Sequence, residues 1–226
     1  MRAFDSTREA PARDVLARLH TAAKGDRLRF PALLPKLVLG RLAGKGLWDI
    51  MTPAAMKDVY MPVNPDQGKL LYLTARSLGA QNVVEFGTSF GISTIYLACA
   101  VKDNGGGRVI GSEIEPSKHA RATQNLIAAG VGEFAEVRLG DALATLADVP
   151  APIDLVLLDG WKDLYLPILK LLAPKLRRGS VVLADNIFTF RAGLRPYVEY
   201  VQSGEHGFVS TTLPLSDGFE YSVYVG

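Results

Sequence analysis

The sequence predicts an α/β fold: a mainly parallel, seven-stranded sheet that is covered by helices on both faces and ends in an antiparallel hairpin. Three observations support this class. Short runs of Val, Ile and Leu alternate with helical segments from residue 82 onward. The runs are continuously apolar, which indicates strands that are buried on both faces, as parallel strands are. Residues 207–226 contain two strand-like segments around Ser216, Asp217 and Gly218, which is the pattern of a hairpin.

The parallel part of the sheet is expected to contain five strands. They are residues 82–86, 108–113, 135–140, 153–159 and 180–185. A helix is expected after each strand, because the apolar spacing changes from strand-like to helical there. These helices run through about Val101, from Pro116 to Ala129, after Asp141, from about Lys162 to Leu176, and near Leu194–Gln202.

Extra helices are expected before the sheet. Helical periodicity is present in roughly Ala12–Ala23 and Ala32–Ala43, and a third helix begins near Pro65 and ends at Gly79. We expect residues 1–60 to form an N-terminal helical segment that serves as a lid, a dimer contact or a substrate surface. Residues 61–226 are expected to form the main domain.

Length and cysteine content suit one α/β domain with an added segment, in a reducing compartment. Cys99 is the only cysteine among 226 residues, so no intramolecular disulfide can form, and it lies in an apolar run typical of a core. The start of the chain lacks the apolar stretch of a signal peptide. Residues 30–51 are interrupted by prolines and basic residues, so they cannot span a membrane. We therefore expect a cytoplasmic protein with no membrane partner.

The charge is unevenly distributed along the chain. The formal net charge is +2, but the first fifty residues carry ten Lys or Arg against five Asp or Glu. A solvated, basic helix face explains this excess. The alternative is a surface for an anionic partner such as RNA or a phosphorylated substrate.

The turn after the first strand is rich in glycine. It reads EFGTSFGIST over residues 85–94, with Gly87 and Gly91 four positions apart. Glycine lets the backbone approach a ligand closely, and the helix that follows offers free N–H groups. The third glycine of a dinucleotide fingerprint is absent. The pattern favours a nucleotide-like cofactor without a pyrophosphate, and the alternative is a tight turn that binds nothing.

Acidic residues end the next two strands. Glu113 ends the second strand, where a carboxylate can accept both ribose hydroxyls of an adenosine group. Asp141 follows the third strand, where a carboxylate can meet the adenine amino group. Either residue can instead cap a helix, Asp141 in particular. Because the carboxyl ends of parallel strands meet at one crevice, the glycine-rich turn and the two acids together favour cofactor binding.

The fourth and fifth strands end in side chains that carry oxygen. Residues 157–167 read LLDGWKDLYLP and residues 182–186 read VLADN, which places Asp159, Asp185 and Asn186 at one crevice. Two carboxylates and an amide oxygen suit Mg²⁺ or another divalent cation, with water and substrate oxygens completing an octahedron. The alternatives are a helix cap and an Asx turn. A lone cysteine and three scattered histidines cannot supply a zinc site.

Lys162 lies three residues beyond Asp159. Partial burial and a nearby divalent cation lower the pKa of a lysine, so that its neutral amine accepts a phenolic proton. The alternative is a solvated lysine at a helix start. Trp161 is a candidate wall of the adenosyl pocket and is equally suited to a core position.

These motifs resemble those of class I S-adenosylmethionine-dependent methyltransferases, which have a Rossmann-like fold. VVEFGTSFG at residues 83–91 is similar to the first motif of that family, and Glu113 and Asp141 occupy its ribose and adenine positions. The resemblance implies S-adenosylmethionine as the cofactor. The cofactor-binding residues that we expect are Val63, Glu85, Gly87, Ser93, Glu113, Asp141, Ala142, Asp159 and Trp161.

A narrower resemblance covers about residues 60–226. DGWKDLYLP with LADN resembles animal catechol O-methyltransferase, and TTLPLSDGF resembles bacterial and plant caffeoyl-CoA O-methyltransferases. It implies that Asp159, Asp185 and Asn186 bind Mg²⁺ or another divalent cation. It also implies that Lys162 is the catalytic base, beside Asp159. One departure is Thr211, which stands where the animal enzyme has a glutamate that holds the second catechol hydroxyl.

The resemblance therefore implies a metal-dependent O-methyltransferase that acts on a small aromatic vicinal diol, and we expect a homodimer. Tyr60, Met61, Phe188 and Phe190 are candidates for the aromatic substrate wall, with core packing as the alternative. One rival function is methylation of a hydroxyuridine in transfer RNA, which the basic first fifty residues would suit. The other is a non-catalytic binding protein, against which the intact metal and lysine set argues.

Overall fold

The computed structural model describes residues 5–26 and 63–226. In this part of the chain, all strands belong to one sheet. The strands are β1 (Asn82–Phe86), β2 (Arg108–Glu113), β3 (Ala135–Leu139), β4 (Ile153–Leu158), β5 (Leu176–Ala184), β6 (Phe208–Leu213) and β7 (Phe219–Tyr224).

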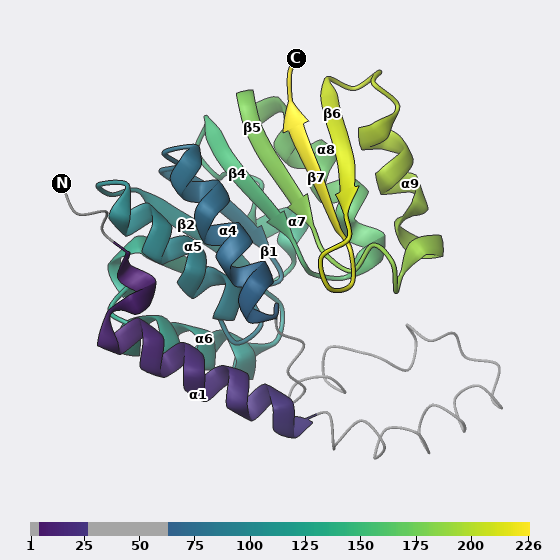
Figure 1. The fold of residues 1–226 in the computed structure, drawn as a ribbon. Coiled ribbons are helices and arrows are strands. Elements are labelled where there is room, and N and C mark those ends of the chain that lie inside the picture. Colours follow the sequence, from purple (N-terminus) through teal and green to yellow (C-terminus); the bar gives the residue numbers. More distant parts are fainter. Residues whose placement is uncertain (1–4, 27–62) are drawn as a thin grey trace, which may run out of the picture.

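The order of the strands across the sheet is β3-β2-β1-β4-β5-β7-β6 (Figure 1). Strands β1 to β5 are parallel to one another. Strand β7 is antiparallel to β5, and β6 is antiparallel to β7. The predicted fold class is therefore confirmed, including the C-terminal antiparallel hairpin.

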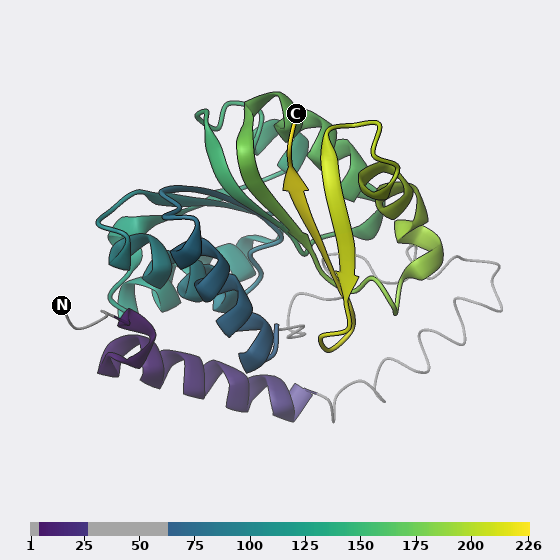
Figure 2. The same ribbon diagram turned by 45° about the horizontal axis from the view of Figure 1, so that its top comes forward.

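Helices cover both faces of the sheet (Figures 1 and 2). On one face, α4, α5 and α6 share a core with α1, and α7, α8 and α9 pack on the opposite face. The helices are α1 (Ala10–Asp26), α4 (Pro65–Ser77), α5 (Ile92–Asp103), α6 (Pro116–Ala128), α7 (Ala142–Thr145), α8 (Tyr165–Leu172) and α9 (Arg191–Gln202).

The central strands are buried on both faces, as their apolar sequences predict. In β4, Leu155 and Leu157 belong to the core that contains α4 and α5, while Val156 and Leu158 belong to the core that contains α8 and α9. All four side chains are completely buried. The sheet thus gives the polar residues at its edges a rigid support.

Helix α1 packs into the same core as α4, α5 and α6. Its residue Leu19 is buried there, and polar contacts secure the turn that precedes the helix. Ser6 donates to the Asp103 carboxylate from its backbone nitrogen at 2.8 Å and from its hydroxyl at 2.5 Å. Lys102 Nζ lies 3.0 Å from Glu9 Oε2. Residues 5–26 are thereby attached to the end of α5.

The segment between β4 and β5 differs from the single helix that was expected. Helix α8 is flanked by two short 3₁₀ turns, Lys162–Leu164 and Ala173–Lys175. Pro174 lacks a backbone N–H, so continuation of the α-helix through it is unfavourable.

Strand β5 is also longer than expected, since it begins at Leu176 rather than at Ser180. Leu176 pairs with Ile153, after which the register shifts. The Ser180 hydroxyl spans this irregularity: it accepts from Arg177 N at 2.9 Å and donates to the Ile153 carbonyl at 2.6 Å.

Some expectations lie outside the described residues, namely the helix at Ala32–Ala43 and the substrate-wall candidates Tyr60 and Met61. Among the helices in residues 5–26 and 63–226, none is long and apolar enough to cross a membrane.

Candidate active site

The predicted acidic site residues lie at the carboxyl edge of the parallel strands. Glu85 is the penultimate residue of β1 and Glu113 the last residue of β2, while Asp159 and Asp185 directly follow β4 and β5. Asp141 lies at the start of α7, after β3. Strands β1 and β4 are neighbours from which the chain order runs in opposite directions. Ligands of open α/β sheets bind at such a switch point.

The glycine-rich turn packs directly on the end of β4. Gly87 has a φ of +97°, and a Cβ atom at this position would lie 2.6 Å from the Asp159 carbonyl oxygen. Gly91 has a φ of +84° and is the N-cap of α5. Both positions thus require glycine for backbone reasons. As a result, the glycine-rich turn lies against Asp159.

Glu85 is a completely buried carboxylate with one unpartnered oxygen. Its Oε2 accepts from the Thr88 hydroxyl at 2.9 Å and from the Thr94 hydroxyl at 2.5 Å. No described group makes a hydrogen bond to Oε1. Burial raises the pKa of Glu85 to about 7, although the nearby hydroxyls of Ser93, Thr94 and Thr88 favour its ionised form. A buried acceptor without a partner favours a ligand that brings a donor, best of all a cationic one.

Glu113 and Asp141 both make backbone contacts of their own. Glu113 accepts from Ser89 N at 2.7 Å and from Glu115 N at 2.8 Å, one bond to each carboxylate oxygen. A carboxylate has about four acceptor sites, so ribose hydroxyls can still bind. Asp141 caps α7 by accepting from Leu143 N at 3.0 Å. The helix cap that the sequence offers as the alternative role of Asp141 is therefore present. It uses one carboxylate oxygen and leaves the second for a ligand.

The other predicted cofactor residues have apolar surroundings. Val63 is 2% exposed and belongs to the core that contains α4 and α5. Ala142 is 4% exposed and belongs to the core on the opposite face, against which Trp161 also packs. Core packing accounts for all three positions, and their contact with the cofactor stays a prediction.

Asp159 and Asp185 are two carboxyl groups with little solvent around them, so they do not readily ionise together. Burial raises the pKa of Asp185 to about 8, and the charge of Asp159 acts in the same direction. Burial also raises the pKa of Asp159 to about 6, against the influence of the Lys162 ammonium group. One lysine does not neutralise two carboxylates. A divalent cation would therefore be stabilised between them.

Lys162 is 7% exposed and is held by contacts on several sides. Its Nζ donates to Asn186 Oδ1 at 2.6 Å and to the Tyr165 hydroxyl at 2.7 Å, and it lies 3.6 Å from Asp159 Oδ1. The Tyr165 hydroxyl in turn donates to the Asp185 carbonyl at 3.2 Å. Burial lowers the pKa of Lys162, while the two aspartates oppose this effect. The expected base and the expected metal ligands are thus brought together.

The orientation of the Asn186 amide is determined by its two partners. Its Oδ1 accepts from Lys162, and its Nδ2 donates to Asp217 Oδ2 at 3.3 Å. Asp217 also accepts from the Thr189 hydroxyl at 2.5 Å, which attaches the loop after β5 to the hairpin turn. Asn186 has a φ of +67°, a conformation that asparagine tolerates better than most residues. Asp217 was not expected to contribute, since its sequence position indicates only a turn.

Sequence reasoning also does not identify Gln67 as a residue of this site. It lies in the first turn of α4, is 2% exposed, and donates from Nε2 to Asp185 Oδ1 at 2.9 Å. Gln67 forms a capping box with Asn64 at the start of α4. No local pattern predicts a contact between residues that are 118 positions apart.

The chemistry of Asp159, Asp185 and Asn186 fits a hard divalent cation. Within residues 5–26 and 63–226, no three His, Cys, Asp or Glu side chains form a group that could hold a metal ion. A metal at this edge would therefore need the amide oxygen of Asn186 as its third protein ligand. This oxygen accepts a hydrogen bond from Lys162 Nζ, and the charges of Asp159 and Asp185 act on the same lysine.

The described candidates for the substrate wall have different positions. The ring centre of Phe190 lies 5.6 Å from Lys162 Nζ, which places this ring at the site. Phe188 is 43% exposed, and its ring lies against Gly218 in the hairpin turn. Thr211 is exposed in β6, where it pairs with Tyr221.

Comparison with known proteins identifies relatives with the same fold. A family model described as a methyltransferase domain matches residues 84–187. A catechol O-methyltransferase from Mycobacterium tuberculosis is 39% identical over 127 residues, which cover 55% of this chain and 56% of that protein. The catechol O-methyltransferase of Mus musculus is 31% identical over 192 residues, which cover 78% of this chain and 70% of that one.

A solved structure agrees with these matches. The O-methyltransferase TomG from Streptomyces achromogenes, crystallised in complex with S-adenosylmethionine, superposes with a TM-score of 0.69 at 30% identity. The match covers 76% of this chain and 88% of TomG. The chain spans little more than half the length of the bacterial catechol O-methyltransferases that it matches. This chain belongs to the class I S-adenosylmethionine-dependent O-methyltransferases related to catechol and caffeoyl-CoA O-methyltransferases.

Proposed function

We propose that this chain catalyses metal-dependent transfer of a methyl group from S-adenosylmethionine to a hydroxyl of a small, catechol-like aromatic substrate. The observation that carries the proposal is the grouping of Lys162 with Asp159, Asp185 and Asn186 at the ends of β4 and β5. Family membership supports the transfer of a methyl group to oxygen.

The carboxyl ends of β1, β2 and β3 supply suitable groups for the cofactor. The unpartnered Oε1 of Glu85 would accept the ammonium group of the methionine part. Glu113 would accept the ribose hydroxyls, and Asp141 the adenine amino group. Val63, Gly87, Ser93, Ala142 and Trp161 are proposed to line the rest of the cofactor site. When bound, S-adenosylmethionine supplies an activated methyl group on a sulfonium.

Asp159, Asp185 and Asn186 would hold Mg²⁺ or another divalent cation. When bound, such an ion acts as a Lewis acid that acidifies a substrate hydroxyl and orients it. The three residues offer two carboxylates and one amide oxygen, a set typical of Mg²⁺ rather than of zinc. Water and substrate oxygens would supply the remaining donors.

Lys162 is proposed to accept the proton of the reacting hydroxyl at Nζ. Its position is fixed by Tyr165 and Asn186, and its burial favours the neutral amine. The substrate oxygen then bonds to the methyl carbon as the carbon–sulfur bond breaks, which gives a methyl ether and S-adenosylhomocysteine. Opposite charges are neutralised during this step, so a site that excludes water favours it.

Three features bear on the choice of substrate. A vicinal diol can place both hydroxyls at the metal site, whereas a monophenol can place only one and would rotate. Phe190, and Phe188 at the hairpin turn, are proposed as aromatic walls. Thr211 offers no carboxylate for the unreacted hydroxyl, so we expect mixed meta and para products on simple catechols.

The test of this function compares four substrates with S-adenosylmethionine and Mg²⁺: a catechol, its two monophenols and its dimethyl ether. We expect methyl transfer to the catechol alone at a substantial rate. A monophenol that reacts as fast as the catechol would contradict the use of both hydroxyls. Failure with every small phenol, together with salt-sensitive methylation of transfer RNA, would instead support the RNA alternative. The cytoplasmic location and the homodimer stay predictions.

A further inference from the structure

The side chain of Gln67 connects the first turn of α4 to the Asp185 carboxylate, which directly follows β5. Its Oε1 accepts from Asn64 N at 2.7 Å, and its Nε2 donates to Asp185 Oδ1 at 2.9 Å. The amide orientation is determined at both ends, because a backbone N–H must face the oxygen and a carboxylate must face the nitrogen. Gln67 is 2% exposed, so solvent does not compete for these contacts.

Asp185 Oδ1 thereby receives two N–H donors. The second is the backbone nitrogen of Asn186, at 2.7 Å. No described residue donates a hydrogen bond to the other carboxylate oxygen of Asp185, Oδ2. The two donors hold the carboxylate plane and leave Oδ2 as the oxygen that can bind a cation. Outer contacts of this kind orient a ligand and set its affinity for metal.

A capping box alone does not explain this residue. Glutamate and glutamine serve equally at the third position of a capping box, because only an acceptor is needed there. A glutamate at position 67 would turn a second carboxylate oxygen toward Asp185, with like charges in a buried place. Glutamine meets both requirements, since it presents an acceptor to the helix start and a donor to Asp185.

We propose that Gln67 is a positioning residue for the metal site, which fixes the Asp185 carboxylate so that Oδ2 binds the divalent cation. The inference rests on the proposed function, because it assigns Asp185 to the metal. Gln67 does not touch the reacting atoms, so its effect is expected on metal affinity rather than on the rate of the chemical step at saturating metal.

The experiment is a calorimetric titration of the metal-free protein with Mn²⁺, followed by activity measurements over a range of Mn²⁺ concentrations. The Gln67→Met variant keeps the size of the side chain and removes its polar groups. We expect its Kd for Mn²⁺ to rise about 10- to 100-fold, as for other residues that orient metal ligands. Its activity should need correspondingly more Mn²⁺, with kcat at saturation within about threefold of wild type.

The matched control is Asn64→Ala. This variant loses the side-chain cap of α4, which accepts from Asp66 N and Gln67 N, but keeps the contact between Gln67 and Asp185. It should unfold at a lower temperature than wild type, because the cap is lost, and should bind Mn²⁺ as wild type does. If both variants weaken Mn²⁺ binding equally, Gln67 acts only through the helix, and the inference is wrong.

The remaining outcomes separate the inference from the proposed function. A wild-type protein that binds Mn²⁺, with a Gln67→Met variant that binds it equally well, would overturn the role of Gln67 alone. A wild-type protein that binds no Mn²⁺ would overturn the metal site and the inference with it. Should Gln67→Met not fold, ¹⁵N-labelled wild type gives the answer: the Gln67 side-chain amide signal must shift on addition of Mg²⁺, and an unmoved signal contradicts the inference.

Discussion

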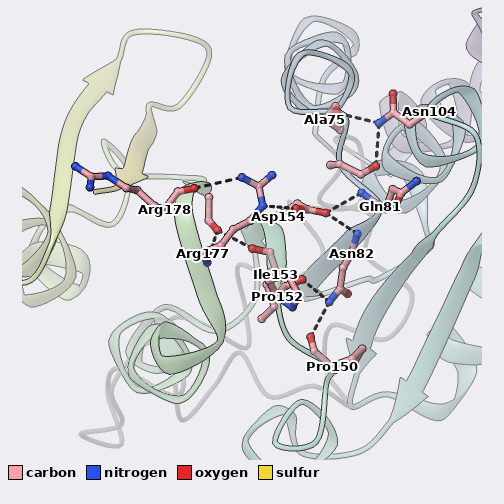
Figure 3. A network of polar contacts seen from close by, with 12 residues as sticks. Ala75, Gln81, Asn82, Asn104, Pro150, Pro152, Ile153, Asp154, Arg177 and Arg178 are labelled. Atoms are coloured by element: carbon pink, nitrogen blue, oxygen red, sulfur yellow. Dashed lines mark hydrogen bonds and ion pairs between the residues drawn. The ribbon is translucent and has the colours of Figure 1, made fainter. Parts of the chain in front are cut away.

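The two edges of the sheet both carry buried or half-buried aspartates, but their surroundings differ. At the amino edge, Asp154 in β4 accepts from Gln81 N at 2.8 Å, from Asn82 N at 2.9 Å and from Arg177 Nε at 2.7 Å (Figure 3). Burial alone would raise the pKa of Asp154, but these donors outweigh it and the pKa is lowered. At the carboxyl edge, the pKa of Asp185 is instead raised.

Further hydrogen bonds near Asp154 connect the loops and helices at the amino edge of the sheet. Asn82 Nδ2 donates to the carbonyls of Pro150 at 2.6 Å and Pro152 at 2.9 Å, and Asn104 Nδ2 donates to those of Ala75 and Ala80 (Figure 3). These bonds join the first residue of β1 to the loop before β4, and the end of α5 to α4 and to the loop before β1. All the hydrogen-bond donors that Asp154 uses at this edge are groups of the protein.

The difference indicates how the molecule divides stability and function between its edges. At the amino edge the charge of Asp154 is matched, so it stabilises the fold. At the carboxyl edge, no described residue makes a hydrogen bond to Glu85 Oε1, and a charge on Asp159 disfavours ionisation of Asp185. Such an arrangement costs stability in the free protein and is relieved by ligands. Substitutions at the two edges should therefore act on different quantities.

The largest effect is expected for Asp185→Asn. This substitution removes a charged ligand of the proposed metal site, so turnover should fall by at least about 1,000-fold. It keeps an acceptor for Gln67 and removes the repulsion from Asp159. The melting temperature of the metal-free protein at pH 8 should therefore stay the same or rise. Steady-state kinetics and thermal unfolding measure the two quantities, and a variant that turns over normally would remove Asp185 from the site.

Lys162→Met should lower kcat by about 100-fold, because a general base acts in the chemical step. Cofactor affinity should change little. The loss should shrink as the pH rises, since the substrate then ionises without a base. Lys175→Met is the control: Lys175 Nζ donates to the carbonyls of Ala147 at 2.6 Å and Val149 at 2.7 Å, at the other edge. Its loss should lower stability and leave kcat unchanged. Equal kcat values for wild type and Lys162→Met at neutral pH would exclude Lys162 as the general base.

Asp154→Asn is expected to lower the free energy of unfolding by about 2 kcal/mol, since it weakens hydrogen bonds to a charged group. The kcat of the folded variant should equal that of wild type at 25 °C. The pKa of Asp154 is lowered from 3.8 in the folded protein, so its stabilisation is present above that pH and is lost as the pH falls further. Chemical denaturation at pH 7 and pH 3 tests this: the difference between variant and wild type should shrink at pH 3. A constant difference would contradict the role of the charge.

A smaller effect is expected from Glu85 on cofactor affinity. Its pKa is raised to about 7, so the carboxyl is largely protonated below that pH and cannot pair with a cation. The affinity for S-adenosylmethionine should therefore increase as the pH rises from 5.5 to 7, by at most about tenfold per unit. Calorimetry on wild type and Glu85→Gln checks this. The variant should bind more weakly at pH 7 and show a flatter profile, whereas parallel profiles would exclude Glu85.

The sequence predicts the residues that topology brings together and misses those that side-chain packing brings together. The ends of apolar runs locate Asp159, Asp185 and Asn186, because parallel strands must end at a common edge. Gln67 contacts Asp185 from α4, 118 positions earlier in the chain. No sequence spacing therefore indicates this contact. The early start of β5 was missed because Arg177, with its neighbours, shows no apolar pattern.

The requirement for metal tests the central claim most directly. Methyl transfer from S-adenosylmethionine to a catechol is measured before and after exhaustive chelation and dialysis, and again after Mg²⁺ is restored. We predict that the rate falls at least about 100-fold without metal and returns with Mg²⁺. The rise in melting temperature with S-adenosylmethionine should persist in the metal-free protein, because Glu85 and Glu113 do not belong to the metal set. Full activity after chelation would contradict the account.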